Sequence, residues 1–337
     1  MTVPAADLAS LDLARTVARA AHRAGGRALI VGGWVRDRLR GEPSKDIDLE
    51  VFGIPQEALA ALLAEHGRVE AVGQSFPVYK VMGGDGGTLD VALPRRESKQ
   101  GRGHKGFVVQ GDPGMSMTDA ARRRDFTINA IAWDPLTDAY EDPFHGREDL
   151  AHRRLRVVDA ERFGDDSLRV LRAVQFAARF DFALDDEATA ICRAIPLDDL
   201  PAERIWGELE KLLLQAPRPS IGLELALTLG VVDALLPELR PMVGCPQEPE
   251  WHPEGDVWVH TLMVVDEAAS RNQDLDRPRR IAIMLGALCH DLGKPLTTAM
   301  IDGRIRSLNH EDAGLAPTIA VLDRLNVHTI SGLDVRT

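Results

Sequence analysis

The chain has 337 residues, 45% of them hydrophobic and 27% charged, a composition ordinary for a soluble protein of two or three domains, and it leaves the oligomeric state open. No apolar run approaches the roughly 18 residues that a membrane span needs, and the N-terminus lacks the basic region of a secretory signal, so we expect a cytoplasmic protein without a membrane segment. The net charge of −12 argues mildly against a nucleic-acid partner without excluding local basic patches, and three widely spaced cysteines fit neither a disulfide framework nor a zinc site.

A helix over residues 6–24 leads into the most informative stretch of the chain, residues 29–52. This stretch predicts a buried strand, a glycine turn, a short helix and a second strand that carries Asp46 and Asp48. Side chains two residues apart on a strand point to the same face. The two carboxylates can therefore hold a divalent cation, and oxygen ligands of this kind suit Mg²⁺.

The turn between these strands is made by Gly32 and Gly33, which let the backbone approach a ligand closely. The start of the short helix that follows favours an anion, and Arg36 adds a charged hydrogen-bond donor. Glycine turn, helix start, arginine and paired carboxylates together predict a nucleotide triphosphate bound with metal. The motif is not a P-loop.

The remaining head elements are a helix over residues 55–66 and strands over 69–72, 78–82 and 88–92. They complete a compact head of about five strands. Asp90 lies in the last of these strands, where a third carboxylate can complete a metal site or accept the proton of an attacking hydroxyl.

Residues 97–114 read as a long polar loop, and its basic residues favour contact with an RNA end or a nucleotide over the alternative of a solvated loop. Residues 119–133 contain three successive arginines before an apolar pattern that predicts a helix. Arg124 precedes that helix, and Asp125 and Asn129 would lie one turn apart on one of its faces.

Residues 162–180 predict an amphipathic helix with Asp166 at its N-terminus, where the helix dipole favours an acid. One face of this helix carries three arginines: Arg169, Arg172 and Arg179. Residues 201–214 predict another helix, on which Arg204 and Glu208 stand one turn apart as a structural pair.

The character of the chain changes after residue 241, where a segment rich in proline and glycine leads into a helix with His260. The vicinal pair His290 and Asp291 follows, and then His310. A single histidine is more often a packing or surface residue, but this recurrence in a helical region predicts a divalent metal site.

Four motifs resemble the bacterial (class II) tRNA nucleotidyltransferase and poly(A) polymerase family, a branch of the superfamily that includes DNA polymerase β. They are GG-x-V-R-D-x-L with D-x-D at residues 32–48, RRDFTINA at 123–130, D-P-x-x-G-x-x-D-L at 142–150 and D-D-x-x-R at 165–169. The resemblance implies an α+β fold: a polymerase-β-like nucleotidyltransferase head followed by an all-helical neck and an HD-like helical domain.

The resemblance also implies roles for single residues. Asp46 and Asp48 would hold two Mg²⁺ ions, and Asp90 would help activate the attacking hydroxyl. Nucleotide contacts would come from Gly32, Gly33, Arg36, Arg124, Asn129 and Arg172. Asp166 and Arg169 would read the base of CTP or ATP through their hydrogen-bonding edges. The chain departs from the family pattern at two positions, with Asp165 where Glu is usual and Gln175 where relatives commonly have Arg.

The C-terminal histidines resemble the HD phosphohydrolase superfamily, which implies a divalent transition metal held by His260, His290 and Asp291. The usual last Asp of that motif is not found before Thr337. We therefore expect either a shortened chain or an incomplete HD site.

We predict a head over residues 1–145, a helical neck that binds RNA over 146–240 and an incomplete HD-like domain over 241–337. The predicted function is template-independent addition of CCA to the 3′ end of tRNA from CTP and ATP, with release of pyrophosphate. Alternatives within the family are CC-adding, A-adding and poly(A)-adding specialists, of which the basic loop argues mildly against the CC-adding one. Alternatives outside it are a metal phosphohydrolase acting on RNA ends, as a 2′,3′-cyclic phosphodiesterase or phosphatase, and a nucleotide-binding module without turnover.

Overall fold

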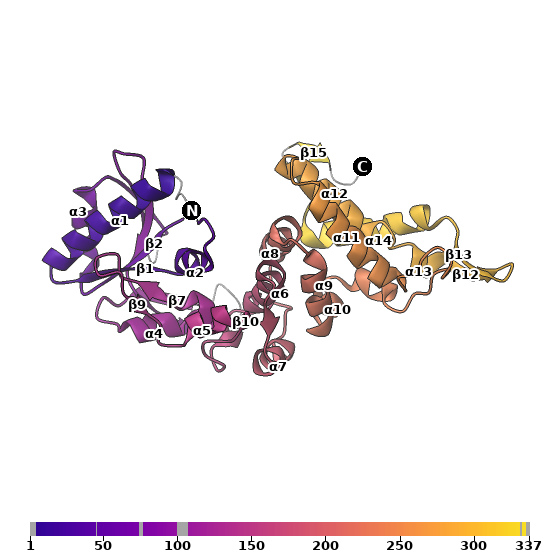
Figure 1. Ribbon diagram of the computed structural model, residues 1–337, viewed down its shortest axis with the longest axis horizontal. Coiled ribbons are helices and arrows are strands. Elements are labelled where there is room, and N and C mark those ends of the chain that lie inside the picture. The colour runs from indigo at the N-terminus through magenta and orange to yellow at the C-terminus, as the bar shows by residue number, and fades with distance from the viewer. Residues whose placement is uncertain (1–4, 45, 74–76, 100–106, 331, 335–337) are drawn as a thin grey trace. The chain divides into compact units, whose positions relative to one another are not determined.

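The computed structural model describes residues 5–44, 46–73, 77–99, 107–330 and 332–334 (Figure 1). The chain divides into two compact units, Met1–Asp165 and Asp166–Thr337. The domain boundaries predicted at residues 145 and 240 stay predictions.

The first unit is built on a seven-stranded sheet with the strand order β3-β4-β5-β2-β1-β8-β9. All five predicted strands are present: β1 (Arg27–Val31), β2 (Asp48–Phe52), β3 (Arg68–Val72), β4 (Val78–Met82) and β5 (Thr88–Ala92). Two short strands that the sequence did not reveal, β8 (Ala132–Trp133) and β9 (Tyr140–Glu141), extend the sheet beyond β1. Strands β2 and β5 pair in parallel, whereas their neighbours β1 and β4 run antiparallel to them. The α+β class is confirmed.

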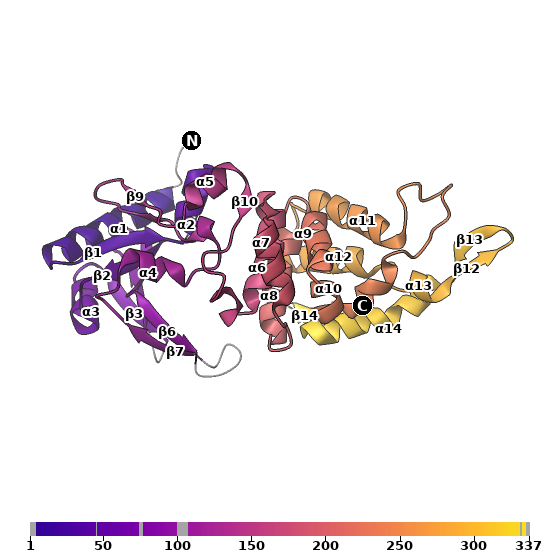
Figure 2. The same cartoon turned by 90° about the horizontal axis from the view of Figure 1, so that it is seen from below.

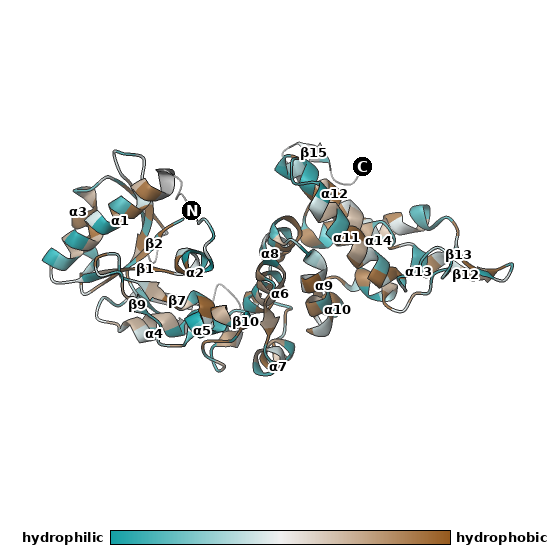
Figure 3. Ribbon diagram, in the orientation of Figure 1, coloured by the Kyte–Doolittle hydropathy of each residue, from teal (hydrophilic) through white to brown (hydrophobic). Residues whose placement is uncertain are grey.

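Alternation of side chains gives this sheet two unlike faces. Ile30 and Leu49 point into the main core, which also takes in apolar residues of α1 (Ala5–Arg23) and α3 (Gln56–Ala64). Leu29 and Val31 point the other way, into a small cluster with Ala132. Figure 3 shows the hydrophobic colouring of β1 and β2. The second face has little apolar surface of its own, and it is the face on which the acidic side chains lie.

The prediction of a loop over residues 97–114 is wrong for the part of this segment that the structure describes. The strands β6 (Arg95–Lys99) and β7 (Phe107–Gly111) form an antiparallel hairpin, visible in Figure 2. The basic residues Arg102 and Lys105 lie outside the described residues.

The helix predicted after Arg124 is also wrong. A short helix, α4 (Met117–Arg122), ends before it, and the chain continues through a 3₁₀ turn at Thr127–Asn129 into β8. All residues from 125 to 135 are buried, so their apolar spacing could not distinguish a helix from a buried irregular segment. The Thr127 N–H donates to the carbonyl of Arg156 at 2.9 Å instead of to a helical partner.

The D-P-x-x-G-x-x-D-L motif forms a turn and the helix α5 (Gly146–Ala151). A Cβ at position 146 would lie 2.1 Å from the carbonyl oxygen of Thr127, so only glycine fits there. Asp149 is fully buried and accepts hydrogen bonds from Thr127, Arg154 and Arg156 at 2.6 to 3.0 Å. The motif therefore holds the buried turn in place, which is a structural role.

The second unit is mainly helical. Its helices are α6 (Leu168–Phe180), α7 (Asp186–Ala194), α8 (Ala202–Gln215), α9 (Pro219–Thr228), α10 (Val231–Leu235), α11 (Val257–Arg271), α12 (Arg277–Cys289), α13 (Lys294–Thr297) and α14 (His310–Leu325). The hairpin of β12 (Thr298–Ile301) and β13 (Arg304–Ser307) lies between α13 and α14 in the chain. The predicted helices at residues 162–180, 201–214 and around His260 and His290 are thus present.

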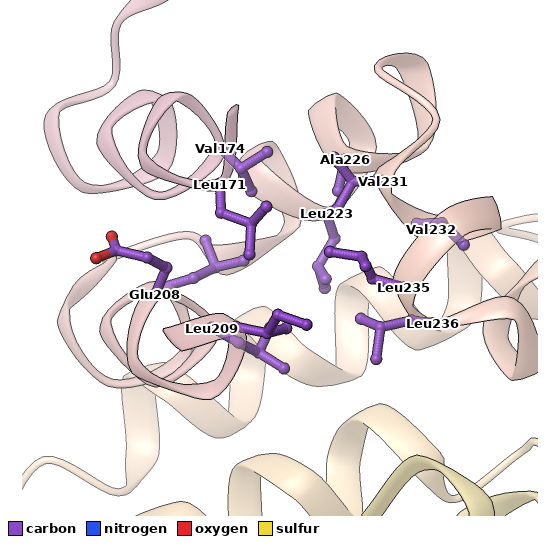
Figure 4. Close-up of a pocket in the computed structure, with 12 residues that line it drawn as sticks. Leu171, Val174, Glu208, Leu209, Leu223, Ala226, Val231, Val232, Leu235 and Leu236 are labelled. Atoms are coloured by element: carbon purple, nitrogen blue, oxygen red, sulfur yellow. The ribbon is translucent and has the colours of Figure 1, made fainter. Parts of the chain in front are cut away.

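Helices α6, α8, α9 and α10 enclose a small apolar cavity of about 30 Å³ (Figure 4). Aliphatic side chains such as Leu171, Leu209 and Leu223 line it, and the Glu208 carboxylate points away from them. Glu208 pairs with Lys211 at 2.8 Å, while Arg204 pairs with Asp166. Arg204 and Glu208, for which we predicted a structural role, therefore each pair with another residue and not with each other.

Candidate functional sites

Three acidic residues gather at one end of the first unit's sheet. Asp48 begins β2, and its register partner in the parallel strand β5 is Asp90. The backbone N–H of Asp90 donates to the carbonyl of Ile47 at 3.0 Å, which fixes that register. Asp46 stands two residues before Asp48, outside the strand in which we had placed it, and its charge still acts on Asp48.

The pKa of Asp48 reflects the charges of the acids around it. The Asp48 side chain keeps access to solvent, but the protein around it displaces much of its hydration, and this desolvation raises the pKa of Asp48 to about 6. The charge of Arg124 opposes the rise, and the charges of Asp90 and Asp46 add to it. A cation among these carboxylates would remove their repulsion, and their oxygen donors fit Mg²⁺.

The glycine turn lies directly beside these acids. Strand β1 ends at Val31, opposite Asp48, and the chain turns at Gly32 with φ +75°. A Cβ on Gly32 would lie 3.1 Å from Nη1 of Arg124 and 3.6 Å from Oδ2 of Asp48. The structure thus brings the predicted Gly32, Arg124 and Asp48 together, and both the backbone angle and the close approach require glycine.

Arg36 and Asn129 meet, but they bind each other and their neighbours. The buried Arg36 guanidinium donates to Asn129 at 2.7 Å and to Asp37 at 2.8 and 2.9 Å. Asn129 in turn donates to Asp125 at 2.9 Å. This network ties α2 (Gly33–Arg40) to the 3₁₀ turn of residues 127–129, so both residues support the turn beside the acids.

Glu50 is a site residue that the sequence interpretation missed. It follows Asp48 by two positions on β2, so it shares the acidic face, and it is 3% exposed. Arg123 donates to it at 2.9 Å, and an Arg124 nitrogen lies 3.7 Å from its other oxygen. The alternating pattern D-x-D-x-E was the available signal. Glu50 anchors both arginines, which holds Arg124 against Gly32.

In the second unit, Asp166 precedes α6 and is already engaged. Arg204 donates to both of its oxygens, at 3.1 and 2.9 Å. Burial alone would raise the pKa of Asp166, but the hydrogen bond and charge of Arg204 lower it. Further along α6, Arg172 lies over the Phe176 ring, and the buried Gln175 accepts a hydrogen bond from Arg179 at 2.9 Å.

Three imidazoles converge on Asp291, which is 1% exposed. The Nε2 atoms of His290, His310 and His260 lie 3.1, 3.5 and 3.8 Å from its carboxylate oxygens. Ligands about 2.1 Å from one metal ion lie roughly 3 to 3.5 Å apart, which the 3.1 and 3.5 Å separations fit, whereas that of His260 is slightly longer. The possible ligand atoms of His260, His290 and Asp291 all lie within 4.8 Å of one another. The predicted His260, His290 and Asp291 are brought together, and His310 joins them.

The other ring nitrogen of each histidine is anchored to an oxygen. Nδ1 of His290 donates to the Ala287 carbonyl at 2.9 Å, and Nδ1 of His310 donates to the Ser307 carbonyl at 2.8 Å. Nδ1 of His260 donates to the Glu254 carboxylate at 2.7 Å. Because these oxygens only accept, a neutral ring keeps its proton on Nδ1 and presents the lone pair of Nε2 toward Asp291, which is the orientation of a metal ligand. A protonated ring instead donates from Nε2 to Asp291, and although burial lowers the pKa of His290, the hydrogen bond to Asp291 is one cause that raises it.

Asp291 carries its own counter-ion in this cluster. The Lys294 ammonium lies 2.8 Å from Oδ2 of Asp291 and donates to Gln247 at 2.7 Å. Burial would raise the pKa of Asp291, but the hydrogen bonds and charges of His290 and Lys294 lower it to about 2.

Comparison with known proteins decides the family. Residues 28–156 match the family described as "Poly A polymerase head domain", and residues 181–242 match "Probable RNA and SrmB- binding site of polymerase A". The chain is 40% identical over 306 residues to the Multifunctional CCA protein of Xanthomonas campestris pv. campestris, covering 88% of this chain and 70% of that protein. It is 41% identical over 306 residues to the Multifunctional CCA protein of Stenotrophomonas maltophilia, covering 88% and 71%. The chain belongs to the CCA protein family of nucleotidyltransferases.

The fold agrees with that membership. A solved structure, "The complex structure of CCA-adding enzyme with CTP", matches 94% of this chain and 67% of its own with a TM-score of 0.63 at 21% identity. CCA-family nucleotidyltransferases generally work with divalent metals. The chain spans about 70% of the length of the curated CCA proteins. Within the described residues, no helix combines the length and apolarity of a bilayer span.

The matched head, residues 28–156, contains the three acids, Gly32 and Arg124. Asp166, Arg169 and Arg172 and the histidine cluster lie outside both matched segments. The roles of individual residues in both sites therefore rest on their geometry.

Proposed function

We propose that this CCA-family protein adds the CCA sequence to the 3′ end of tRNA, using CTP and ATP and releasing pyrophosphate. The observation that carries the proposal is the meeting of Asp48, Asp90 and Arg124 at Gly32, in a head that matches the polymerase family. Carboxylates that can bind a metal ion and an arginine that can bind phosphate therefore lie at one turn.

Asp46 and Asp48 are the residues that would hold Mg²⁺. The proximity of the carboxylates and the raised pKa of Asp48 both fit a site that is electrostatically incomplete without a cation. Divalent ions bound there would stabilise the charge on the entering and leaving oxygens during phosphoryl transfer.

The chain's own groups orient the reactants. The Gly32 turn lets the triphosphate approach the backbone, and Arg124, held by Glu50, donates to phosphate oxygens. Asp90 accepts the proton of the tRNA 3′-hydroxyl as that oxygen attacks the α-phosphate, and pyrophosphate leaves. Arg36 and Asn129 keep the turn in position.

The second unit supplies base reading and RNA contact. Asp166 and Arg169 present carboxylate and guanidinium edges to cytosine or adenine, and Arg172 contributes to phosphate binding. Because Asp166 pairs with Arg204 in this structure, base reading requires either a shared hydrogen bond or a rearrangement of Arg204. Binding of tRNA through its backbone should weaken as salt rises.

The test is incorporation of labelled CTP and ATP, each alone and together, into tRNA that ends before CCA, after C or after CC. A CCA-adding enzyme extends the first two with CTP and the third with ATP, then stops. Addition of A alone, of CC alone, or of long A tracts would identify a specialist instead. Nucleotide binding without incorporation on any substrate would reduce the head to a binding module and refute the proposal.

A second candidate activity, hydrolysis of phosphate esters, is favoured by the histidine cluster. Three imidazoles with anchored Nδ1 atoms face the buried carboxylate of Asp291, which suits a divalent transition metal. The test is release of phosphate from a nucleoside 2′,3′-cyclic phosphate or 3′-phosphate with Ni²⁺, Mn²⁺ or Mg²⁺. Activity lost in Asp291→Ala and kept in Asp46→Ala supports it, whereas no turnover with any of these metals contradicts it.

A further inference from the structure

A pocket of about 250 Å³ lies beside the histidine cluster in the second unit. Its lining combines His310 and Lys294, which reach Asp291, with residues that the cluster does not use, among them Trp251 and Arg306. Side chains that face Asp291 and side chains that do not therefore meet around one space, so a molecule in this pocket would reach the cluster.

Arg306 is the unexplained member of this lining. Its Nε is buried and has no hydrogen-bond partner, and within the described chain no carboxylate pairs with its guanidinium. Arg304, two residues earlier on the same strand, pairs with Glu250 at 3.0 Å. A buried donor without an acceptor costs free energy, and a guanidinium in a pocket satisfies its donors best with a phosphate or carboxylate.

The other groups of the pocket indicate which anion fits. Lys294 adds a second cation near Asp291, and Glu248 commits one oxygen to the Ile305 N–H at 3.0 Å. Trp251 is 58% exposed, and beside the Arg304 guanidinium, which lies 5.7 Å from the centre of its ring, it offers an aromatic surface on which a base can stack. Cations beside a candidate metal cluster and an exposed indole suit a phosphate ester that carries a nucleobase.

We propose that this pocket binds a nucleoside phosphate, with Arg306 on the phosphate and Trp251 against the base. The inference deepens the candidate phosphohydrolase function, because it places the phosphate next to His310 and Lys294. The ligand class is the phosphorylated ribonucleoside at an RNA end, rather than a 5′-triphosphate, which belongs to the head.

The test is calorimetric titration of the whole chain in EDTA with adenosine 3′-monophosphate and, separately, inorganic phosphate. We expect Arg306→Gln to weaken both ligands by at least 10-fold. The matched control Arg304→Gln should change the affinity for inorganic phosphate by less than 2-fold; phosphate is the ligand for this control because Arg304 lies over the Trp251 ring. Trp251→Ala should weaken the nucleotide about 10-fold and leave inorganic phosphate unchanged. Arg306→Lys keeps a positive charge and should lose less than Arg306→Gln; it replaces that variant in the comparison if Arg306→Gln fails to fold.

Binding that is unaffected by Arg306→Gln, or an equal loss of affinity for inorganic phosphate in Arg304→Gln, would overturn the inference. Turnover of a nucleoside 2′,3′-cyclic phosphate with added metal is measured in parallel. Arg306-dependent binding without turnover would refute hydrolysis and support the pocket. Turnover with a KM and kcat that do not change in Arg306→Gln would support hydrolysis and refute the binding of the phosphate in this pocket.

Discussion

The two candidate sites hold carboxylates in opposite surroundings. Asp48 stands among other acids, and desolvation with their repulsion raises its pKa to about 6. Asp291 is more deeply buried, but the imidazoles and Lys294 around it lower its pKa to about 2. Burial disfavours the ionised form of both, so the neighbouring charges account for the difference.

The acids of the head repel one another, whereas Asp291 already has a cation beside it. A metal ion in the head relieves repulsion between acids. At Asp291 a metal ion must compete with an ammonium group that lies 2.8 Å away. We therefore expect the head acids to oppose folding slightly when metal is absent, and the Asp291 cluster to support it.

The largest expected effect separates the two sites by activity. Asp48→Ala should lower nucleotide addition to tRNA by on the order of 10³-fold, because a metal-holding carboxylate is lost, and should leave ester hydrolysis unchanged. Asp291→Ala should do the reverse. The surface variant Asp12→Ala controls for handling in both assays. Loss of both activities in either variant would show that the sites are not independent.

A smaller effect concerns the stability of the protein without metal, and its direction differs between the two sites. Asp291→Asn should lower the free energy of unfolding by about 3 kcal/mol, because Lys294 is left buried without its partner charge. Denaturant unfolding in EDTA measures this, and the double variant Asp291→Asn, Lys294→Met should recover most of the loss. Equal stability of Asp291→Asn and the parent would contradict the account of that cluster.

Arg124 should matter to nucleotide affinity more than to folding. Arg124→Gln should raise KM for CTP and ATP by about 10- to 100-fold, the effect of one charged hydrogen bond to phosphate. Arg122→Gln is the matched control, since Arg122 lies on the same segment and pairs with Asp159. A similar change in KM in both variants would mean that Arg124 acts only through general charge.

The smallest effect is the pH dependence that Asp48 adds. Its folded pKa of about 6 exceeds the ordinary 3.8, so the folded state binds the proton more tightly, and stability falls as pH rises from about 4 to about 6. In EDTA, Asp48→Asn should match the parent in Tm below pH 4 and exceed it by a few degrees above pH 6. Saturating Mg²⁺ should stabilise the parent and so remove the higher Tm of Asp48→Asn. A difference in Tm that is constant from pH 4 to 7 would contradict the raised pKa of Asp48.

Most of the fold could be predicted from local patterns in the sequence. The alternation in residues 47–52 placed the second strand, although it put Asp46 inside a strand that begins at Asp48. The pairing of β2 with β5, which brings Asp90 to Asp48, joins segments 42 residues apart and cannot be obtained from local spacing. Residues 125–135 were misread because burial on all sides removes the periodicity that marks a helix.

The sequence pointed to the candidate metal-binding residues of both sites but not to the residues that support them. Acidic and histidine motifs pointed to Asp48 and Asp291, because those residue types bind metals. Glu50, Glu254 and Lys294 hold or balance these groups through contacts made only by the folded chain. The spacing D-x-D-x-E could have placed Glu50 on the acidic face, but no spacing rule assigns its arginine partners, or assigns Glu254 and Lys294 to the histidine cluster.

The most direct test of the central claim is anomalous diffraction from crystals of the protein grown with Mn²⁺ and ATP. The account predicts a manganese peak within about 2.2 Å of carboxylate oxygens of both Asp46 and Asp48, in contact with the triphosphate beside Gly32 and Arg124. ATP bound at that turn with no metal on either aspartate, or triphosphate bound elsewhere in the chain, would contradict it.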